Sequence, residues 1–90
     1  MGIMNVIWSD ESWDDFEYWL DNDKRNVKKI RKLIKDTKRH PFDGIGKPEP
    51  LHDNLSGLWS RRITDEHRFV YYVENNSLYI VSARFHYSND

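Results

Sequence analysis

The chain has 90 residues, of which 38% are hydrophobic and 32% charged, and its formal net charge is −1. A chain of this length forms one small domain, here 1–90, with no room for a deep cofactor cavity. It contains no cysteine, which excludes disulfides, thiolate metal sites and thiol nucleophiles. No apolar run approaches the roughly 20 residues of a membrane-spanning helix, so we expect no membrane partner. We also expect a cytoplasmic protein that uses no cofactor.

The first half of the chain predicts a strand followed by two helices. Residues 5–8 form a strand-like run, and Ser9 is a good N-cap for a helix over 10–21 with an acidic first turn. Residues 22–23 interrupt this helix, and a second helix follows over about 24–38. The apolar residues expected to face inward are Trp13, Phe16, Trp19 and Leu20 in the first helix, and Val27, Ile30, Leu33 and Ile34 in the second. The apolar face of each helix is therefore expected to pack against a sheet.

The net charge hides a strong asymmetry between two consecutive segments. Residues 1–23 contain seven acidic and no basic residues, whereas residues 24–39 contain nine basic residues and one acidic residue, Asp36. A basic helix suits a polyanion such as a nucleic acid. A solvated helix face, paired with the acidic helix before it, explains the same pattern, so both interpretations stay open.

The second half of the chain predicts a long loop and three strands. Residues 40–57 contain all three prolines and three of the four glycines, which indicates a loop with a restricted backbone. Three strands follow over 58–63, 67–73 and 78–85, joined by hairpin turns at 64–66 and 74–77. The order β-α-α-β-β-β predicts an α+β fold. In it a helical hairpin packs on one face of a mainly antiparallel sheet, and the other face is free for a ligand.

Alternation along the predicted strands brings functional side chains together. Arg62 precedes the first turn and Arg68 follows it, so the two guanidinium groups are expected to converge. The residues expected to share a face are Arg68, Val70 and Tyr72 in one strand, and Leu78, Ile80, Ser82, Arg84 and His86 in the next, if that strand is regular to its end. His86 and Tyr87, at the end of the chain, and Glu49, between two prolines, could reach the same patch.

A carboxylate, a histidine and arginines are the groups needed to cleave RNA through its own 2′-OH. A glutamate with the reference pKa of about 4.3 can accept the 2′ proton at pH 7, and a histidine near about 6.5 can protonate the leaving 5′ oxygen. Arginine binds two phosphate oxygens at once. Each residue also has an ordinary explanation: a surface acid, a cross-strand ion pair or an inert terminal histidine. The residues alone therefore leave an RNase and a nucleic-acid-binding or partner-binding module both open.

Four longer strings are more specific than any of these motifs. They are IWSDESWDDF at 7–16, KIRKLIKDT at 29–37, GIGKPEPL at 44–51 with NLSGLWSRRI at 54–63, and RFHY at 84–87. Together they resemble the YoeB toxins, a family of the RelE superfamily found in type II toxin–antitoxin pairs. The resemblance covers roughly residues 4–87, nearly the whole chain.

The resemblance implies a compact α+β fold, RelE-like and similar to that of microbial ribonucleases. It also implies a homodimeric toxin that enters the A site of the 70S ribosome and cuts the mRNA there without a metal. The general base of the family falls on Glu49, its phosphate-stabilising arginine on Arg68 and its general acid on His86. Substrate-binding positions fall on Arg62, Tyr87, Lys47 and His52. Ribosomal RNA is then a natural partner for the basic helix.

Further partners follow from the same resemblance. A YefM-like antitoxin would cover the site with a disordered acidic segment that folds on binding, and operator DNA would be bound only through the toxin–antitoxin complex. Two rival functions stay open: a non-catalytic nucleic-acid-binding or ribosome-binding module, and an operator co-repressor that acts only with its antitoxin.

The chain departs from the family pattern in two places. His52 lies where related toxins tend to have lysine, so phosphate contact there is expected to be weaker or pH-dependent. Residues 88–90 extend past the usual end and are expected to form a flexible tail. Residues 1–3 are expected to be a leader or a cloning remnant, since Met4 is a natural start.

Overall fold

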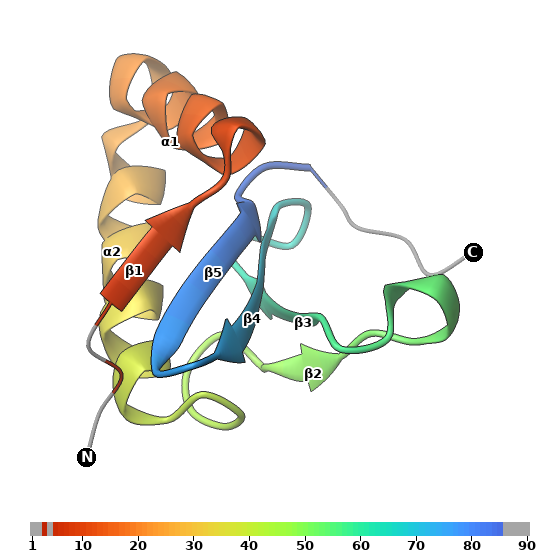
Figure 1. The fold of residues 1–90 in the computed structure, drawn as a ribbon. Helices are drawn as coiled ribbons and strands as arrows, with labels where there is room; N and C mark the ends of the chain where they lie inside the picture. The colour runs from red at the N-terminus through yellow and green to blue at the C-terminus, as the bar shows by residue number, and fades with distance from the viewer. Residues whose placement is uncertain (1–2, 4, 86–90) are drawn as a thin grey trace.

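The computed structural model describes residue 3 and residues 5–85, which form two helices packed against one five-stranded sheet (Figure 1). In chain order the elements are β1 (Asn5–Trp8), α1 (Asp10–Asn22), α2 (Lys24–Arg39), β2 (Glu49–Pro50), the 3-10 helix η1 (Asp53–Leu55), β3 (Trp59–Arg62), β4 (Arg68–Glu74) and β5 (Ser77–Ser82). The strand order is β1-β5-β4-β3-β2, with β1 and β5 parallel and the other neighbours antiparallel. This is the predicted α+β arrangement.

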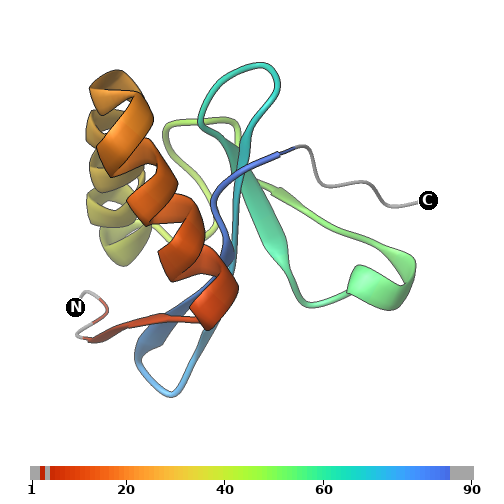
Figure 2. The same cartoon turned by 90° about the horizontal axis from the view of Figure 1, so that it is seen from above.

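The helices cover one face of the sheet only. Seen from above, α1 and α2 lie side by side on one side, and the connection between β2 and β3, which contains η1, projects away from them (Figure 2). The opposite face of the sheet is therefore the one that the helices leave open.

Within the described part of the chain, neither helix is long and apolar enough to cross a membrane.

Side-chain caps determine where both helices begin. Ser9 is the N-cap of α1, as predicted, and its hydroxyl accepts a hydrogen bond from the Ser12 amide at 3.1 Å. Asp23 serves both helices. Its amide donates to the Trp19 carbonyl at 2.9 Å, and its carboxylate accepts from the Arg25 amide at 3.0 Å. The predicted interruption between the helices is therefore a single shared cap.

The core lies between the helices and the sheet, and it confirms the predicted inward face of α2. The buried core residues include Val27, Ile30 and Leu33 of α2, Phe69 and Tyr71 of β4, and Leu78 and Ile80 of β5, with Ile34 packed at the edge. The predicted face of α1 is wrong in part. Trp19 is 5% exposed, but Trp13 and Leu20 are 43% and 45% exposed. The rotation of α1 lets the Trp19 indole donate to the Ala83 carbonyl at 2.8 Å, a partner that helical spacing does not reveal.

Several strand boundaries differ from the prediction. β2 and η1 both fall within the predicted loop, 40–57. The prolines there exclude a central strand, but β2 lies at the edge of the sheet, where the missing N–H of proline is tolerated. β5 ends at Ser82 and does not continue to residue 85. The predicted turn at 74–77 is confirmed as a tight turn with Asn75 and Asn76 at φ 51° and 58°, the left-handed conformation of a type I′ hairpin.

Candidate active site

Three predicted site residues come from strands whose register places them on the face of the sheet opposite the helices. Glu49 pairs with Ser60, and Arg62 pairs with Arg68. Ser60 and Arg62 are two residues apart in β3, so they and their cross-strand partners share one face. Arg61, between them, points the other way and contacts α2. We call the face formed by Glu49, Ser60, Arg62 and Arg68 the site face.

Glu49 is an exposed carboxylate at the edge of this face. Pro48 and Pro50 restrict the backbone on both sides of it, and the pairing of β2 with β3 aligns it with Ser60. Among the residues that the structure describes, the Glu49 carboxylate makes no hydrogen bond or ion pair. It is therefore available to accept a proton or a hydrogen bond from a ligand.

Arg62 and Arg68 lie directly opposite each other in the sheet, as the alternation of the strands predicted. One terminal nitrogen of Arg68 donates to the carbonyls of Thr64 and Asp65, both at 2.9 Å, so its guanidinium lies along the turn between β3 and β4. Arg62 has no side-chain partner among the described residues. Like charges directly opposite each other destabilise a sheet, so this pair favours an anion bound between them.

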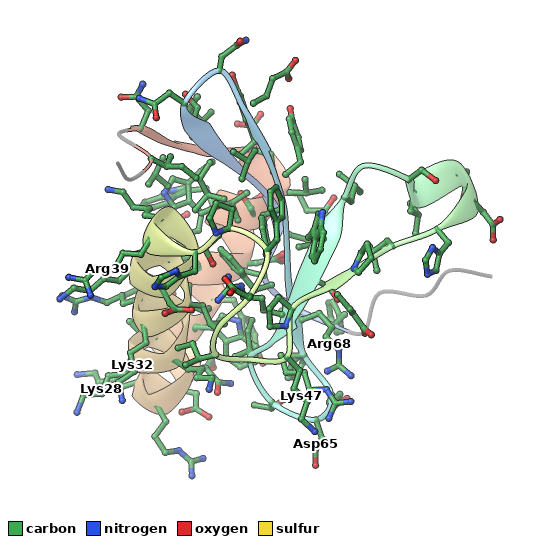
Figure 3. The ribbon with its side chains drawn as sticks, turned by 90° about the horizontal axis from the view of Figure 1, so that it is seen from below. Lys28, Lys32, Arg39, Lys47, Asp65 and Arg68 are labelled. Carbon is green, nitrogen blue, oxygen red and sulfur yellow. The ribbon has the colours of Figure 1, made fainter. Side chains whose placement is uncertain are left out.

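A groove of about 340 Å³ extends from the site face toward α2. It is lined by Lys29, Gly46, Lys47, Arg62, Ile63, Thr64 and Asp65, and we call it the basic groove. The Gly46 carbonyl accepts from the Arg62 amide at 2.7 Å, which brings the loop that carries Lys47 against the end of β3. Figure 3 shows Lys47 and Arg68 on the same side of the molecule, close to Asp65. Lys29 of α2 joins these cations, and sequence reasoning did not single it out.

Sequence reasoning also missed Arg61, which is completely buried. Its guanidinium donates to the Asp36 carboxylate of α2 at 2.7 Å, and to the carbonyls of Asp43 and Ile45 at 2.8 and 3.1 Å. It also donates to the His40 carbonyl. These bonds fix the loop between α2 and β2, which leads directly to Lys47 and Glu49. The available signal was the pair Arg61-Arg62, since alternation turns one of two neighbouring arginines toward the core.

The bonds of Arg61 also change the acidity of two neighbours. The hydrogen bond from Arg61 holds the pKa of the Asp36 carboxyl below its usual range. Tyr71 accepts from Arg61 at 3.2 Å and donates to the Pro41 carbonyl at 2.6 Å. Burial raises the pKa of the Tyr71 hydroxyl, against the opposing effect of Arg61. The ion pair and the tyrosine thus form one buried polar network behind the site face.

The single face expected from Leu78 onward required a strand that is regular to its end, and β5 does not meet this condition over the described residues. Tyr71 pairs with Ile80, but Val70 pairs with Ser82, so β5 advances by two residues where β4 advances by one. This β-bulge leaves Ile80 toward the helices and turns Ser82 to the site face. Beyond the strand, the Arg84 guanidinium lies 3.4 Å from the centroid of the Tyr18 ring of α1. By contrast, Arg68, Val70 and Tyr72 alternate onto one face as predicted, since β4 pairs with β3 in unbroken register from Arg68 to Tyr71.

The remaining predicted site residues are only partly covered by the structure. His52 is exposed and directly precedes η1, two residues after the end of β2. His86 and Tyr87 lie outside the described residues, as do residues 88–90 of the expected tail. In residue 3 and residues 5–85, no three histidine, aspartate or glutamate side chains are grouped in a way that could hold a metal ion.

The sequence matches a known protein family over most of its length. A profile described as "YoeB-like toxin of bacterial type II toxin-antitoxin system" matches residues 8–87. The chain belongs to this YoeB family. Toxin YoeB of Escherichia coli (strain K12) is 66% identical over 84 residues, which span 93% of this chain and 100% of that toxin. Toxin YoeB of Synechocystis sp. is 54% identical, over 93% of this chain and 98% of its own length.

Solved structures of YoeB toxins have the same fold as this chain. The YoeB/ParE toxin from Agrobacterium tumefaciens has a TM-score of 0.91 at 52% identity and covers 93% of this chain and 100% of its own. The YoeB dimer from Staphylococcus aureus has a TM-score of 0.88 at 45% identity and covers 94% and 99%. The RelBE2 toxin–antitoxin complex from Mycobacterium tuberculosis, at 17% identity and a TM-score of 0.71, shares the fold. The resemblance to YoeB toxins and the RelE-like α+β fold are therefore confirmed.

Proposed function

We propose that this member of the YoeB family is a ribosome-dependent endoribonuclease that cuts mRNA in the A site and thereby inhibits translation. The observation that carries this proposal is the site face, where an unpaired carboxylate shares one face of the sheet with two opposed arginines. Cleavage of a phosphodiester by the neighbouring 2′-OH needs a carboxylate to accept the 2′ proton and positive charge to stabilise the phosphate oxygens. Because mRNA and ribosomes are the targets, the protein acts in the cytoplasm.

The chemistry uses the 2′-OH of the RNA as the nucleophile, so the reaction requires no metal. The Glu49 carboxylate takes the 2′ proton while the 2′ oxygen forms a bond to phosphorus. Arg68 stabilises the negative charge that grows on the phosphate oxygens. The bond from phosphorus to the 5′ oxygen breaks, and His86 gives its proton to that oxygen. The products are a 2′,3′-cyclic phosphate, which water opens to a 3′-phosphate, and a 5′-OH.

The substrate-binding residues extend along the message on both sides of the scissile phosphate. Arg62 and Lys47 line the basic groove, where three cations face one acid, Asp65. His52 and Tyr87 complete the set, and contact by His52 is weaker than that of a lysine when its imidazole is neutral. The groove therefore holds the phosphates that flank the cut.

The outer face of α2 supports binding to ribosomal RNA. Lys28, Lys32 and Arg39 point away from the sheet (Figure 3), and two shallow hollows there are lined mainly by lysine and arginine. Within the described residues, no ion pair joins an acid of α1 to a base of α2. The basic charges of α2 are thus left for a polyanion, and their attraction to phosphates is sensitive to salt.

Two protein partners are part of the proposal. The Staphylococcus aureus relatives include a YoeB dimer and a YoeB-YefM complex. These relatives support a homodimer and a YefM-like antitoxin for this chain as well. An acidic antitoxin segment that folds on binding suits the basic groove, and operator DNA is then bound only through the complex.

The proposed function is tested with purified protein, 70S ribosomes and a short message, and the cuts are mapped by primer extension. We expect discrete cuts at the A-site codon that leave 5′-OH ends. Glu49→Gln, Arg68→Ala and His86→Ala each reduce the rate by about 10²-fold or more. The matched controls are Glu74→Gln, at the exposed end of β4, and His40→Ala, in an exposed part of the loop. Both controls keep the rate of the wild type.

Two other outcomes would favour the rival functions. Salt-sensitive binding to ribosomes without any cut indicates a non-catalytic module. A shift of operator DNA only in the presence of the antitoxin, with normal growth when the toxin is expressed alone, indicates a co-repressor. Unchanged cutting by all three site variants would refute the roles assigned to Glu49, Arg68 and His86.

A further inference from the structure

Two aromatic side chains lie on the same side of the sheet as the site face. Tyr72 of β4 pairs with Tyr79 of β5, and their neighbours Tyr71 and Ile80 belong to the core. Because side chains alternate along a strand, Tyr72 and Tyr79 point to the side opposite the helices. Their rings are stacked, with the centroids 4.7 Å apart and an angle of 4° between the ring planes. We call this pair the tyrosine platform.

The tyrosine platform is accessible to a ligand. Tyr72 and Tyr79 are both half-buried, whereas the core residues beside them, Tyr71 and Ile80, are enclosed. Among the residues that the structure describes, neither hydroxyl of the platform makes a hydrogen bond. A cross-strand aromatic pair also stabilises the sheet. That role accounts for the contact between the two rings, but it leaves their exposed surface and their hydroxyls without a partner in this part of the chain.

The tyrosine platform is next to the proposed site. Val70 lies between Tyr72 and Arg68 on the same face of β4, so the Cα atoms of Tyr72 and Arg68 are about 13 Å apart along the strand. Val70 also pairs with Ser60, which in turn pairs with Glu49. The row of side chains that contains Glu49 is therefore only two residues, about 7 Å, from the row that contains the platform.

The charges around the tyrosine platform favour a base over a phosphate. Arg68, with Arg62 opposite, lies at one end of β4, and the exposed Glu74 lies at the other end. Phosphates are attracted to the arginines and repelled by Glu74. On the far side of the platform, Tyr79 pairs with Ile7 of β1, which is apolar and 40% exposed. An RNA backbone held at the arginines would therefore meet the platform with a base.

We propose that the tyrosine platform binds one unpaired base of the mRNA, in a nucleotide that flanks the scissile phosphate. Aromatic rings on an open sheet face bind single-stranded RNA in this way, because every base has a π-face that stacks on a ring. This inference rests on the proposed function, since it adds a base-binding element to the same site. Stacking is tolerant of sequence, so the platform strengthens binding of the message and does not select a codon.

The first experiment observes the rings directly. A sample with 13C-labelled tyrosine rings is titrated with a short 2′-O-methyl RNA, which lacks the nucleophile and is not cut. We expect the ring signals of Tyr72 and Tyr79 to move as the base stacks on them. The ring of Tyr18, an exposed residue of α1, is the internal control and should not move. The same oligonucleotide with abasic sugars keeps its phosphates and should move none of these signals.

The second experiment measures cleavage on programmed ribosomes. Tyr72→Leu keeps an apolar side chain without a ring, and Tyr72→Phe keeps the ring without its hydroxyl. We expect Tyr72→Leu to raise KM by about fivefold or more with little change in kcat, because the stacking is the same before and during the chemical step. Tyr72→Phe stays within about twofold of the wild type. Phe42→Leu is the matched control and should keep the KM of the wild type, since it removes an exposed ring that packs against Trp59 on the helix side of the sheet.

Messages with a single abasic nucleotide supply a readout that a merely structural role would not move. For the wild type, an abasic nucleotide at one position beside the cut should raise KM by about fivefold or more relative to the intact message. Tyr72→Leu should not discriminate between the two messages at this position, because the ring that the base would contact is absent. A loss of sheet stability alone would affect the intact and the abasic message equally.

The outcomes separate this inference from the function on which it rests. A wild-type protein that cuts no message refutes the proposed function, and the ring signals then decide whether the tyrosine platform binds a base. If the wild type cuts and Tyr72→Leu discriminates against the abasic message as strongly, the inference alone is overturned. If that variant also sediments as a monomer where the wild type is a dimer, a second copy covers the face instead. If Tyr72→Leu does not fold, ring signals that stay in place overturn the inference, and signals that move support it.

Discussion

At the scale of single residues, the site is built from charges that the fold treats in two ways. Glu49 and Arg62 have no partner among the described residues, and both point into the face opposite the helices. Arg61 is buried and saturated with acceptors, including the carboxylate of Asp36. The free charges are suited to a ligand, and the buried pair holds the loop that carries Glu49. Two acids that make hydrogen bonds within the fold, Asp36 and Asp15, are expected to respond to pH in opposite ways.

The first prediction concerns Asp36. Because Arg61 lowers its pKa in the folded protein, Asp36 stabilises the fold above its unfolded pKa of about 3.9, and this contribution is lost as the pH falls through the folded value. Asp36→Asn should therefore be less stable than the wild type at pH 7, and the difference should shrink toward pH 3. Thermal unfolding between pH 3 and 7 measures this, with the exposed Asp21→Asn as the control. A constant difference at every pH would contradict it.

The second prediction concerns Asp15, where the sign is reversed. Burial raises the pKa of Asp15, against the opposing effects of the Ala83 amide and Arg84. A raised folded-state pKa means that its contribution to stability is present below the unfolded pKa and is lost as the pH rises through the folded value. Asp15→Asn keeps an acceptor for Ala83 without the charge. Urea unfolding should show this variant to be more stable than the wild type at pH 7 and equal to it at about pH 3.

At the scale of elements, spacing and caps predicted what depends on local sequence. The cap at Ser9, the inward face of α2 and the turn at Asn75 and Asn76 all follow from neighbours in the chain. The pairing of Arg62 with Arg68 was predictable because the two strands are short, regular and joined by one turn. These local patterns were sufficient to place both arginines on one face of the sheet.

The features that the sequence did not reveal all depend on distant partners. β2 exists because β3 offers an edge, and the rotation of α1 follows from the bond between Trp19 and Ala83. The bulge that turns Ser82 to the site face changes no local pattern. Lys29 joins the basic groove only because the loop at Gly46 packs against β3. Such partners lie many residues apart, so alternation and helical spacing cannot predict their contacts.

The third prediction tests that loop. Gly46 has φ +80°, and a Cβ there would lie 2.7 Å from Cδ2 of Leu33, so Gly46→Ala introduces both backbone strain and a clash. We expect a loss of stability of about 2–4 kcal/mol and slower cleavage, because Lys47 and Glu49 follow directly. Gly57→Ala is the matched control: its φ is +97°, but nothing lies within 4 Å of the added Cβ. It should cost about 1–2 kcal/mol. Equal urea midpoints for the two variants would refute the clash.

At the scale of the whole molecule, charge is segregated between two antiparallel helices. The acids of α1 and the bases of α2 form no ion pairs with each other among the described residues. The formal net charge is only −1, yet the positive and negative charges are concentrated on different helices. Such a distribution orients the protein in the field of a polyanion before any contact forms.

The fourth prediction follows from this segregation. Replacing Lys28, Lys32, Lys35 and Arg39 together by glutamine should weaken binding to ribosomes. It should also reduce the slope of log affinity against log salt by about one for each phosphate that the variant no longer neutralises. Filter binding at several salt concentrations measures both quantities. The control carries Asp10→Asn, Asp14→Asn and Asp21→Asn on α1. An equal reduction of the slope in this control would show that the basic face of α2 has no special part in binding.

The parallel pairing of β1 with β5 affects when the sheet can be completed during synthesis of the chain. Among the described strands, β1 is the first to be synthesised, yet its neighbour in the sheet is the last one, some seventy residues later, as the pairing of Val6 with Leu78 shows. A nascent polypeptide therefore has no place to dock this strand until nearly all of it has emerged. A toxin of this family therefore has an incomplete sheet for almost the entire time that the ribosome is making it.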